Sequence, residues 1–265
     1  MKVIAVTLER CSGCALMIDG EIVFSSSEER YTRIKADSTF PLKSIENALK
    51  FAKIEGKDLD QVVLCDKELT VLASIVNLYS VFSVDDHLKL MKNYWHPKLI
   101  ENKSISFLHT VKDKINLNQY PINTKFAKSL DFFKPENPYN YEDVGKISKF
   151  YKEVFSDLLK IDKSKISHMD HHSCHAAYGF YGSPIRDDNT LIVTADAFGD
   201  GLSGTVSIFE KNNNKIKRVK KYNHRDFQLG RIYRLTTLYM RMLPGEHEYK
   251  VMGLSSYYTG PKREE

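Results

Sequence analysis

Cysteine and long apolar runs are both scarce in this sequence. Four cysteines occur among the 265 residues: Cys11, Cys14, Cys65 and Cys174. They are too few and too scattered to form the disulfide framework of a small secreted domain. The longest apolar stretch, residues 73–84, is broken by Asn77 and by serines, and it falls short of the about 20 residues that span a bilayer. The N-terminus lacks the apolar run of a signal peptide, so we expect a soluble, cytoplasmic protein without membrane segments.

Length and charge set loose limits on function. With 265 residues, 42% of them hydrophobic, the chain can form one large domain or two small ones, each with its own core. The net charge of +5 suits an anionic ligand such as a nucleotide without requiring one.

A pattern of strand, loop, strand, turn and strand occurs twice. The strands are expected at residues 3–7, 14–18 and 21–24 in the first copy and at residues 191–196, 205–209 and 215–222 in the second. In the first copy, the pair Asp19-Gly20 between two apolar runs is typical of a hairpin turn. A glycine-bearing loop is expected at residues 197–204 of the second copy.

Two such units predict an α/β fold with duplicated half-domains, each a mixed sheet flanked by helices. This is the architecture of actin, Hsp70 and the sugar kinases, and the inference is an analogy at the level of the fold. We expect one domain over residues 1–265, with a first half at about 1–165. The second half is expected to begin at about 190 and to be cut short at 265. Helical spacing at Ile45, Ala48, Leu49 and Ala52, and again over residues 147–159, indicates core helices.

Residues 69–143 have no clear periodicity and are rich in lysine, asparagine and aromatic residues. We interpret them as an insertion into the first half. Insertions of this size often carry the surface that selects a ligand.

Three histidines stand within five positions after Asp170, in the run DHHSCH. Asp170 is a favourable N-cap for a helix, and on that helix His171 and His175 would share one face because they lie four residues apart. They could bind one metal ion, with His172 turned toward substrate or toward a supporting partner. Asp196, at the end of its strand, would complete a set of two histidines and one carboxylate, which is common for Fe(II) or Zn(II). Alternatively, the histidines are ordinary surface or capping residues.

Four blocks in this order along the chain resemble the NodU/CmcH-type O-carbamoyltransferases, in their N-terminal, carbamoyl-transferring domain. The blocks are SSSEERYTRIKADSTFP at Ser25–Pro41, DHHSCHAAYGFYGSP at Asp170–Pro184, TADAFGDG at Thr194–Gly201 and PGEHEYKVMGLSSY at Pro244–Tyr257. Together they span almost the whole chain.

The resemblance implies that His171, His175 and Asp196 bind iron or a similar divalent metal, with Fe(II) favoured over Zn(II). It implies that Lys35 contacts a nucleotide. The family transfers a carbamoyl group from carbamoyl phosphate to an acceptor hydroxyl, and ATP first converts the donor into carbamoyl-adenylate. That first step belongs to a separate C-terminal domain, and the transfer belongs to the domain resembled here.

The residue types suit this chemistry. Backbone N–H groups at Gly199 and Gly201 could approach a phosphate, because glycine has no Cβ, and Lys35 and Lys250 could neutralise it. The acceptor hydroxyl needs a base, for which His172 and Asp200 both remain candidates. The charged residues Glu28, Glu29, Arg30 and Arg33 are expected to form ion pairs beside the strand.

The sequence departs from the family at two places. Glu9 and Arg10 stand where a His-Asp pair is usual, so base catalysis or acceptor binding there is in question. The sequence given stops at Glu265, without the C-terminal adenylate-forming domain or a further aspartate ligand of the family. We therefore expect a second polypeptide to supply the remainder, unless the chain is a fragment or its function has changed.

Three alternatives remain open. A non-catalytic nucleotide- or partner-binding module would fit Glu9 and Arg10. The lysine-rich segment 210–225 admits nucleic-acid binding, although an exposed basic hairpin edge explains it better. The pair Cys11 and Cys14 could bind zinc, but buried small residues beside a hairpin explain them better. The acceptor, whether a sugar, an antibiotic precursor or a nucleotide, cannot be read from the sequence.

Overall fold

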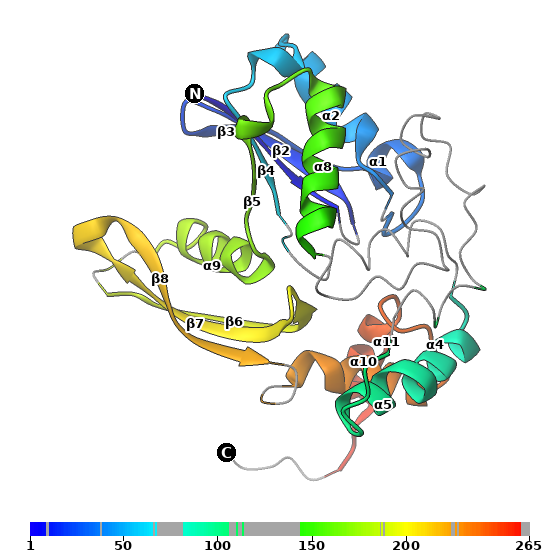
Figure 1. Cartoon of the computed structure of the whole chain (residues 1–265). Helices are drawn as coiled ribbons and strands as arrows, with labels where there is room; N and C mark the ends of the chain where they lie inside the picture. The colour runs from blue at the N-terminus through cyan, green and yellow to red at the C-terminus, as the bar shows by residue number, and fades with distance from the viewer. Residues whose placement is uncertain are drawn as a thin grey trace.

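The computed structural model describes residues 1–8, 11–37, 39–65, 67, 82–105, 110, 113, 144–185, 187, 189–223, 226 and 228–260. Glu9, Arg10 and most of the expected insertion lie outside the described residues. The described part is a mixed α/β structure with two sheets (Figure 1). No helix in the described ranges is long and apolar enough to cross a membrane.

The first sheet has five strands in the order β3-β2-β1-β4-β5. They are β1 (Lys2–Thr7), β2 (Gly13–Ile18), β3 (Glu21–Ser27), β4 (Gln61–Leu64) and β5 (Ile166–His168). The first three strands are antiparallel, and β4 and β5 run parallel to β1. The hairpin predicted at Asp19-Gly20 is confirmed, with φ angles of 51° and 92° at the two turn residues. Positive φ at both positions matches the right-handed twist of paired strands.

Two helices pack on this sheet, α2 (Leu42–Ala52) and α8 (Val144–Leu159). Phe40, just before α2, packs its ring against Phe155 of α8 with 5.1 Å between centroids, so both helices cover the same face. The predicted core position Ile45 is 1% exposed and Phe155 is fully buried. Short helical segments connect these elements: α1 (Glu29–Thr32), η1 (Gly56–Asp58) and η7 (Lys163–Lys165).

The second sheet consists of three antiparallel strands, β6 (Leu191–Gly199), β7 (Leu202–Glu210) and β8 (Lys215–Asn223). Segment η8 (Lys211–Asn213) joins the last two strands. Helix α9 (His171–Tyr181) follows β5 and packs on this sheet, between it and the first sheet (Figure 1). Phe180 of α9 stacks on Phe209 of β7 with 4.1 Å between ring centroids. The prediction of a loop at residues 197–204 is wrong, because β6 extends to Gly199, β7 begins at Leu202, and a two-residue turn at Asp200 and Gly201 joins them.

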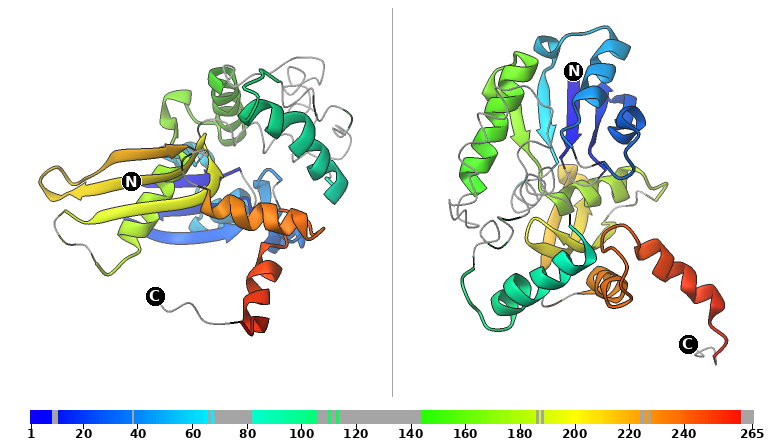
Figure 2. Two further views of the ribbon diagram at one scale, coloured as in Figure 1. Left: turned by 90° about the horizontal axis from the view of Figure 1, so that it is seen from below. Right: turned by 90° about the vertical axis from the view of Figure 1, so that its right-hand side faces the viewer.

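Another group of helices lies beside the end of the second sheet where β6 turns into β7 (Figure 2). It comprises α4 (Val84–Leu90), the π-helical turn η2 (Met91–Trp95), α5 (His96–Leu99), α10 (Leu229–Tyr239), α11 (Glu248–Gly253) and η9 (Leu254–Tyr257). The first three come from the expected insertion. Trp95 of η2 packs edge-on against Phe198 of β6, with 6.2 Å between ring centroids. The described part of the insertion therefore reaches the second sheet.

The ion pairs expected for Glu28 and Glu29 are only partly present. Glu28 is 2% exposed, and its two oxygens accept the backbone N–H groups of Lys43 (3.1 Å) and Ser44 (2.8 Å) at the start of α2. The carboxylate therefore caps a helix, because the first N–H groups of a helix have no partner within it. Glu29 accepts the N–H of Ala36 at 2.8 Å and forms only a loose pair with Arg30 at 3.7 Å.

Phe155 provides a test of how much α8 stabilises the first sheet. Phe155→Ala removes a fully buried ring and should lower the free energy of unfolding by about 3–5 kcal/mol. Leu158→Ala, on the same helix but 39% exposed, is the control and should cost clearly less. Denaturant unfolding monitored by circular dichroism measures both. Equal losses in the two variants would contradict this packing.

Candidate functional site

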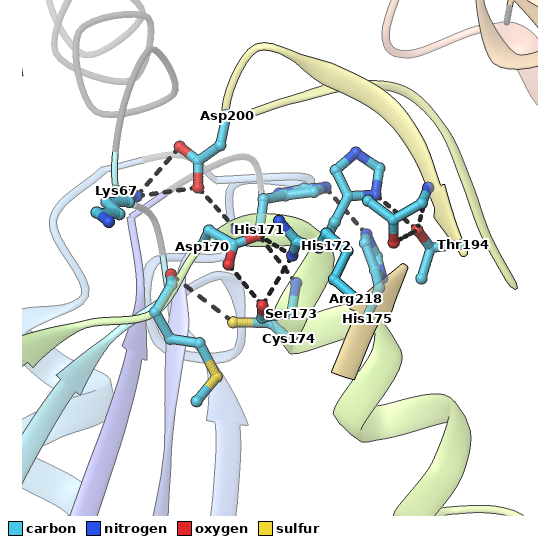
Figure 3. A network of polar contacts seen from close by, with 12 residues as sticks. Lys67, Asp170, His171, His172, Ser173, Cys174, His175, Thr194, Asp200 and Arg218 are labelled. Carbon is cyan, nitrogen blue, oxygen red and sulfur yellow. Dashed lines mark hydrogen bonds and ion pairs between the residues drawn. The ribbon is translucent and has the colours of Figure 1, made fainter. Parts of the chain in front are cut away.

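Helix α9 begins at a cap that is anchored by the neighbouring sheet (Figure 3). Asp170 accepts the Ser173 backbone N–H at 3.1 Å and the Ser173 hydroxyl at 2.5 Å. Arg218 of β8 donates to Asp170 at 2.5 Å and to Ser173 Oγ at 2.8 Å. The predicted N-cap is therefore confirmed. Burial alone would raise the pKa of Asp170, but the hydrogen bonds from Ser173 and Arg218 outweigh it and lower that pKa.

The side chains of His171, His175 and Asp196 converge on one point. Asp196 Oδ2 lies 2.6 Å from His171 Nε2 and 3.4 Å from His175 Nε2, and the two nitrogens are 3.0 Å apart. Asp196 Oδ1 instead accepts the Ala197 N–H at 2.6 Å, which leaves Oδ2 to face the imidazoles. The helical spacing predicted for His171 and His175 and the strand predicted to carry Asp196 thus bring these three residues together, with Asp196 inside β6 and not at its end.

This donor set fits a divalent cation. One oxygen and two nitrogens lie within 4.8 Å of one another, and ligand atoms bound to one ion at about 2.1 Å are themselves roughly 3.0–3.4 Å apart. Lone pairs of three such atoms repel one another unless a proton or a metal ion lies between them. Two imidazoles and a carboxylate suit Fe(II) and Zn(II) among the common metals. His175 is 52% exposed and His171 only 13%, so the group is reachable from solvent at the His175 side.

The carboxylate of Asp196 is held in its ionised form. Its partial burial would raise the pKa, but hydrogen bonds to His171 and His175 outweigh that effect, so the pKa lies well below its usual range. A negative charge at this point favours a cation between the imidazoles.

Two glycines allow the close packing behind this group. A Cβ on Gly199 would overlap the imidazole of His171, and a Cβ on Gly230 of α10 would lie 2.5 Å from the backbone nitrogen of Ala197. Strand β6 also loses its regular pairing with β7 between Ala195 and Gly199. Such irregularities redirect side chains and are frequent near functional sites. The backbone here is therefore shaped around His171 and Asp196.

Asp200 ties the two sheets together at this site. Its carboxylate accepts the backbone N–H of Lys67, beyond β4, at 3.1 Å to each oxygen, and the N–H of His171 at 2.7 Å (Figure 3). Asp200 is 7% exposed and has a positive φ of 48°, followed by Gly201 at 78°. The predicted base therefore already binds backbone groups of two segments, and a base role would require it to release them.

His172 lies beneath the site, fully buried. Its Nδ1 is 2.8 Å from Thr194 Oγ1, which in turn is 2.8 Å from Thr205 Oγ1. This polar chain joins α9 to β6 and β7. Burial lowers the pKa of His172, and a contact with the Leu202 backbone only partly opposes it, so the ring is neutral near pH 7. The geometry favours a positioning role, and the predicted base role would require exposure of the ring.

The two predicted nucleotide-binding lysines both lie near the ring of Tyr249. Lys35 Nζ lies 5.2 Å from the ring centroid of Tyr249, and Lys250 Nζ lies 5.9 Å from the same centroid. Gly199 and Gly201, also predicted to approach a phosphate, lie instead at the turn after β6, next to His171 and Asp200.

Sequence reasoning missed several residues around the site. Thr194 could have been found, because residues two apart on a strand share a face and Thr194 precedes Asp196 by two. The contact of Phe198 with Trp95, and of Arg231 over the Trp95 ring at 5.1 Å, had no local signal. For Arg218 the sequence indicated only a place in a basic hairpin, and not its contacts with Asp170 and Ser173.

None of the four cysteines belongs to the group formed by His171, His175 and Asp196. All four cysteines are free thiols, and the metal-ligand cluster found among the described residues contains none of them. Cys14 is buried in β2, where burial and the charge of Glu28 raise its pKa to about 12. A thiol held protonated in this way is a poor metal ligand.

Comparison with known proteins identifies the family. The family model for the carbamoyltransferase N-terminus matches residues 4–263. The chain belongs to the carbamoyltransferase family. The resemblance drawn from the four sequence blocks is thereby confirmed.

Individual relatives of this carbamoyltransferase N-terminal region are distant. An uncharacterised protein of Synechocystis sp. is 26% identical over 246 residues, which cover 93% of this chain and 33% of the relative. An uncharacterised protein of Methanocaldococcus jannaschii is 25% identical over 253 residues, covering 89% and 38%. The nodulation protein NolNO of Sinorhizobium fredii is 24% identical over 246 residues, covering 92% and 27%. The chain thus spans about a third of the length of these curated relatives.

Gly199 provides a test of the ligand geometry in this carbamoyltransferase domain. Gly199→Ala should push the His171 ring away from Asp196 and weaken Co²⁺ binding by at least about tenfold, as is usual when a ligand loses its support. Gly179→Ala is the control, because Gly179 lies on the same helix as His171 with open space around it. Titration followed by Co²⁺ absorption measures both. Unchanged affinity in Gly199→Ala would show that the ring position is unimportant.

The cap at Asp170 provides a pH test. The folded pKa is lowered, so the ionised side chain stabilises the fold above its unfolded pKa of about 3.9, and this stability is lost as the pH falls through the lower folded value. Asp170→Asn keeps a capping oxygen but removes the charge facing Arg218. The variant should be less stable than the wild type at pH 7, and the difference should shrink as the pH falls below about 3.9 and through the lowered folded pKa of Asp170. A pH-independent difference would contradict the ionic contribution.

Proposed function

We propose that this domain carries out metal-assisted O-carbamoyl transfer. The donor is carbamoyl-adenylate, made from carbamoyl phosphate and ATP, and the acceptor is a hydroxyl group of a small molecule or a nucleotide. The observation that carries the proposal is the convergence of His171, His175 and Asp196 within a chain of the carbamoyltransferase family. The activity of the complete protein is part of this proposal, because the chain spans about a third of its relatives.

In this proposal the three converging residues hold a divalent cation, with Fe(II) favoured. A bound divalent ion would supply Lewis acidity toward the carbamoyl carbonyl or a phosphate oxygen. The chain's own part is to hold the ligands. Asp200 fixes the backbone at His171, and the buried His172 fixes the helix against Thr194. Both residues thereby support the ligand geometry.

Phosphate recognition is assigned to Lys35 and Lys250 and to the backbone at Gly199 and Gly201. The lysines supply positive charge to the adenylate. At the separate turn after β6, Gly201 would let backbone N–H groups approach an anion, whereas the space beside Gly199 is filled by the His171 ring. The region of residues 69–143 is proposed to select the acceptor. The contact of Trp95 with Phe198, two residues after Asp196, supports this because it brings the insertion close to the ligand set.

The duplicated architecture is also part of the proposal. The units β1–β2–β3 and β6–β7–β8 are both antiparallel three-strand meanders. In the first sheet β4 adds beside β1, whereas β6 pairs only with β7 among the described strands. Leu191 and Val193 on the outer face of β6 are 62% and 64% exposed. We propose that the region present in the longer relatives, in the same or a second polypeptide, adds strands there and supplies the adenylate-forming domain.

The test is carbamoyl transfer to hydroxyl acceptors with ATP and carbamoyl phosphate, using the chain together with the polypeptide that supplies the remaining family length. His171→Ala and His175→Ala should each reduce transfer by at least about a hundredfold and abolish stoichiometric metal binding, because each removes a ligand. Tyr178→Ala is the control, since Tyr178 lies on the same helix, is 81% exposed and is not one of the three converging residues. Full activity of the two ligand variants would refute the site.

A second candidate function is a non-catalytic nucleotide-binding module, motivated by Glu9 and Arg10 in place of the usual His-Asp pair. Metal content separates the two readings. Nucleotide binding by a purified chain that takes up no iron or zinc would favour the module. Nucleic-acid binding through the basic strand β8 has less support, because Arg218 and Lys217 of that strand already pair with Asp170 and Glu210.

A further inference from the structure

Two lysines from distant parts of the chain share a single tyrosine ring. Lys35 lies in the segment after α1, and Lys250 lies on α11. Their Nζ atoms are 5.2 and 5.9 Å from the ring centroid of Tyr249, within the about 6 Å over which an ammonium group is attracted to an aromatic face. Tyr249 is 53% exposed, and both lysines are exposed, so a ligand can reach the group from solvent.

The backbone that carries Lys35 is held in place on both sides. Thr32 Oγ1 donates to Asp37 Oδ2 at 2.5 Å, and the N–H of Ala36 donates to Glu29 at 2.8 Å. Ala36 has a positive φ of 54°, a conformation that needs such support in a residue with a Cβ. Lys35 therefore projects from a fixed loop toward α11, and Tyr249 is what it meets there.

No carboxylate among the described residues pairs with the ammonium groups of Lys35 and Lys250. Among the described residues neither Lys35 nor Lys250 forms an ion pair, and the ring of Tyr249 is the partner that both have. Two ammonium groups drawn to one ring repel each other, and an aromatic face accepts none of their N–H groups with the strength of an oxygen. Six N–H donors and two positive charges match a doubly charged group with several acceptor oxygens. A phosphoryl group has this character.

We propose that Tyr249 is a positioning residue that gathers Lys35 and Lys250 into one subsite for a phosphoryl group. The inference rests on the proposed function, in which the substrates carry phosphate, and it adds the residue that organises phosphate recognition. In this proposal Tyr249 acts through the two lysines near its ring and not as a platform for the base.

The test compares AMP, inorganic phosphate and adenosine by isothermal titration calorimetry on the intact chain. Tyr249→Leu should weaken binding of AMP and phosphate by roughly three- to tenfold, the range expected for loss of cation–π positioning, and leave adenosine unaffected. Tyr249→Phe keeps the ring and should remain within about twofold of the wild type. Comparison of AMP with free phosphate shows whether the subsite serves a nucleotide phosphate or a small phosphate compound.

Two controls separate positioning from simple structural support. Tyr257→Leu changes another tyrosine, 80% exposed on η9, and should leave all three affinities unchanged. In a Lys35→Gln, Lys250→Gln background, Tyr249→Leu should have no further effect on AMP binding, because residues that act through one another are not additive. Thermal unfolding checks that each variant is folded.

Several results would overturn the inference. They are absence of AMP and phosphate binding in the wild type, an unchanged AMP affinity in Tyr249→Leu, and an equal loss of adenosine affinity, which would mean that the base stacks on the ring. Failure of the proposed function would look different. Carbamoyl transfer would be absent, or insensitive to His171→Ala, while phosphate binding still depended on Tyr249.

Discussion

The structure depends on the meeting of one carboxylate oxygen, Asp196 Oδ2, with two imidazole nitrogens of a single helix. Three lone-pair atoms 2.6–3.4 Å apart need a shared proton or a cation between them, and surrounding contacts hold their side chains in place. The cap at Asp170 fixes where α9 begins, and Asp200 fixes the backbone of His171 to the loop beyond β4. Because α9 enters directly from β5, the first sheet sets the helix and the second sheet presents the carboxylate. A cation at this point would join ligands from helix α9 and from strand β6 of the second sheet.

Local patterns were sufficient to predict part of this site. The spacing of His171 and His175, the cap at Asp170 and the strand that carries Asp196 are all visible in a few neighbouring residues, and the structure has each of them, although that strand continues past Asp196 to Gly199. The same holds for the hairpin at Asp19-Gly20 and the core helix α2, since turn chemistry and helical periodicity act over short distances. The fold class of mixed α/β is likewise correct, while its division into duplicated halves stays a prediction.

The remaining features depend on how distant segments pack, and no local pattern encodes them. Glu28 was expected to form an ion pair but caps α2, because the tertiary fold places that helix end above it. The expected loop after Asp196 is the end of strand β6 followed by a tight turn. Gly199 at that strand end has no Cβ and so leaves room for the His171 ring. Lys35 and Lys250 lie in separate sequence blocks, and only the fold brings them near one ring. The roles predicted for Glu9 and Arg10 fall outside the described residues.

The chain thus brings two histidines and one aspartate together, places two lysines near one tyrosine ring, and belongs to the carbamoyltransferase family. We propose that His171, His175 and Asp196 bind a single divalent ion. The most direct measurement is anomalous scattering from crystals grown with Co²⁺. The account predicts one strong peak about 2.0–2.2 Å from both Nε2 atoms and from Asp196 Oδ2. A peak elsewhere, or none between these three side chains at saturating Co²⁺, would contradict it.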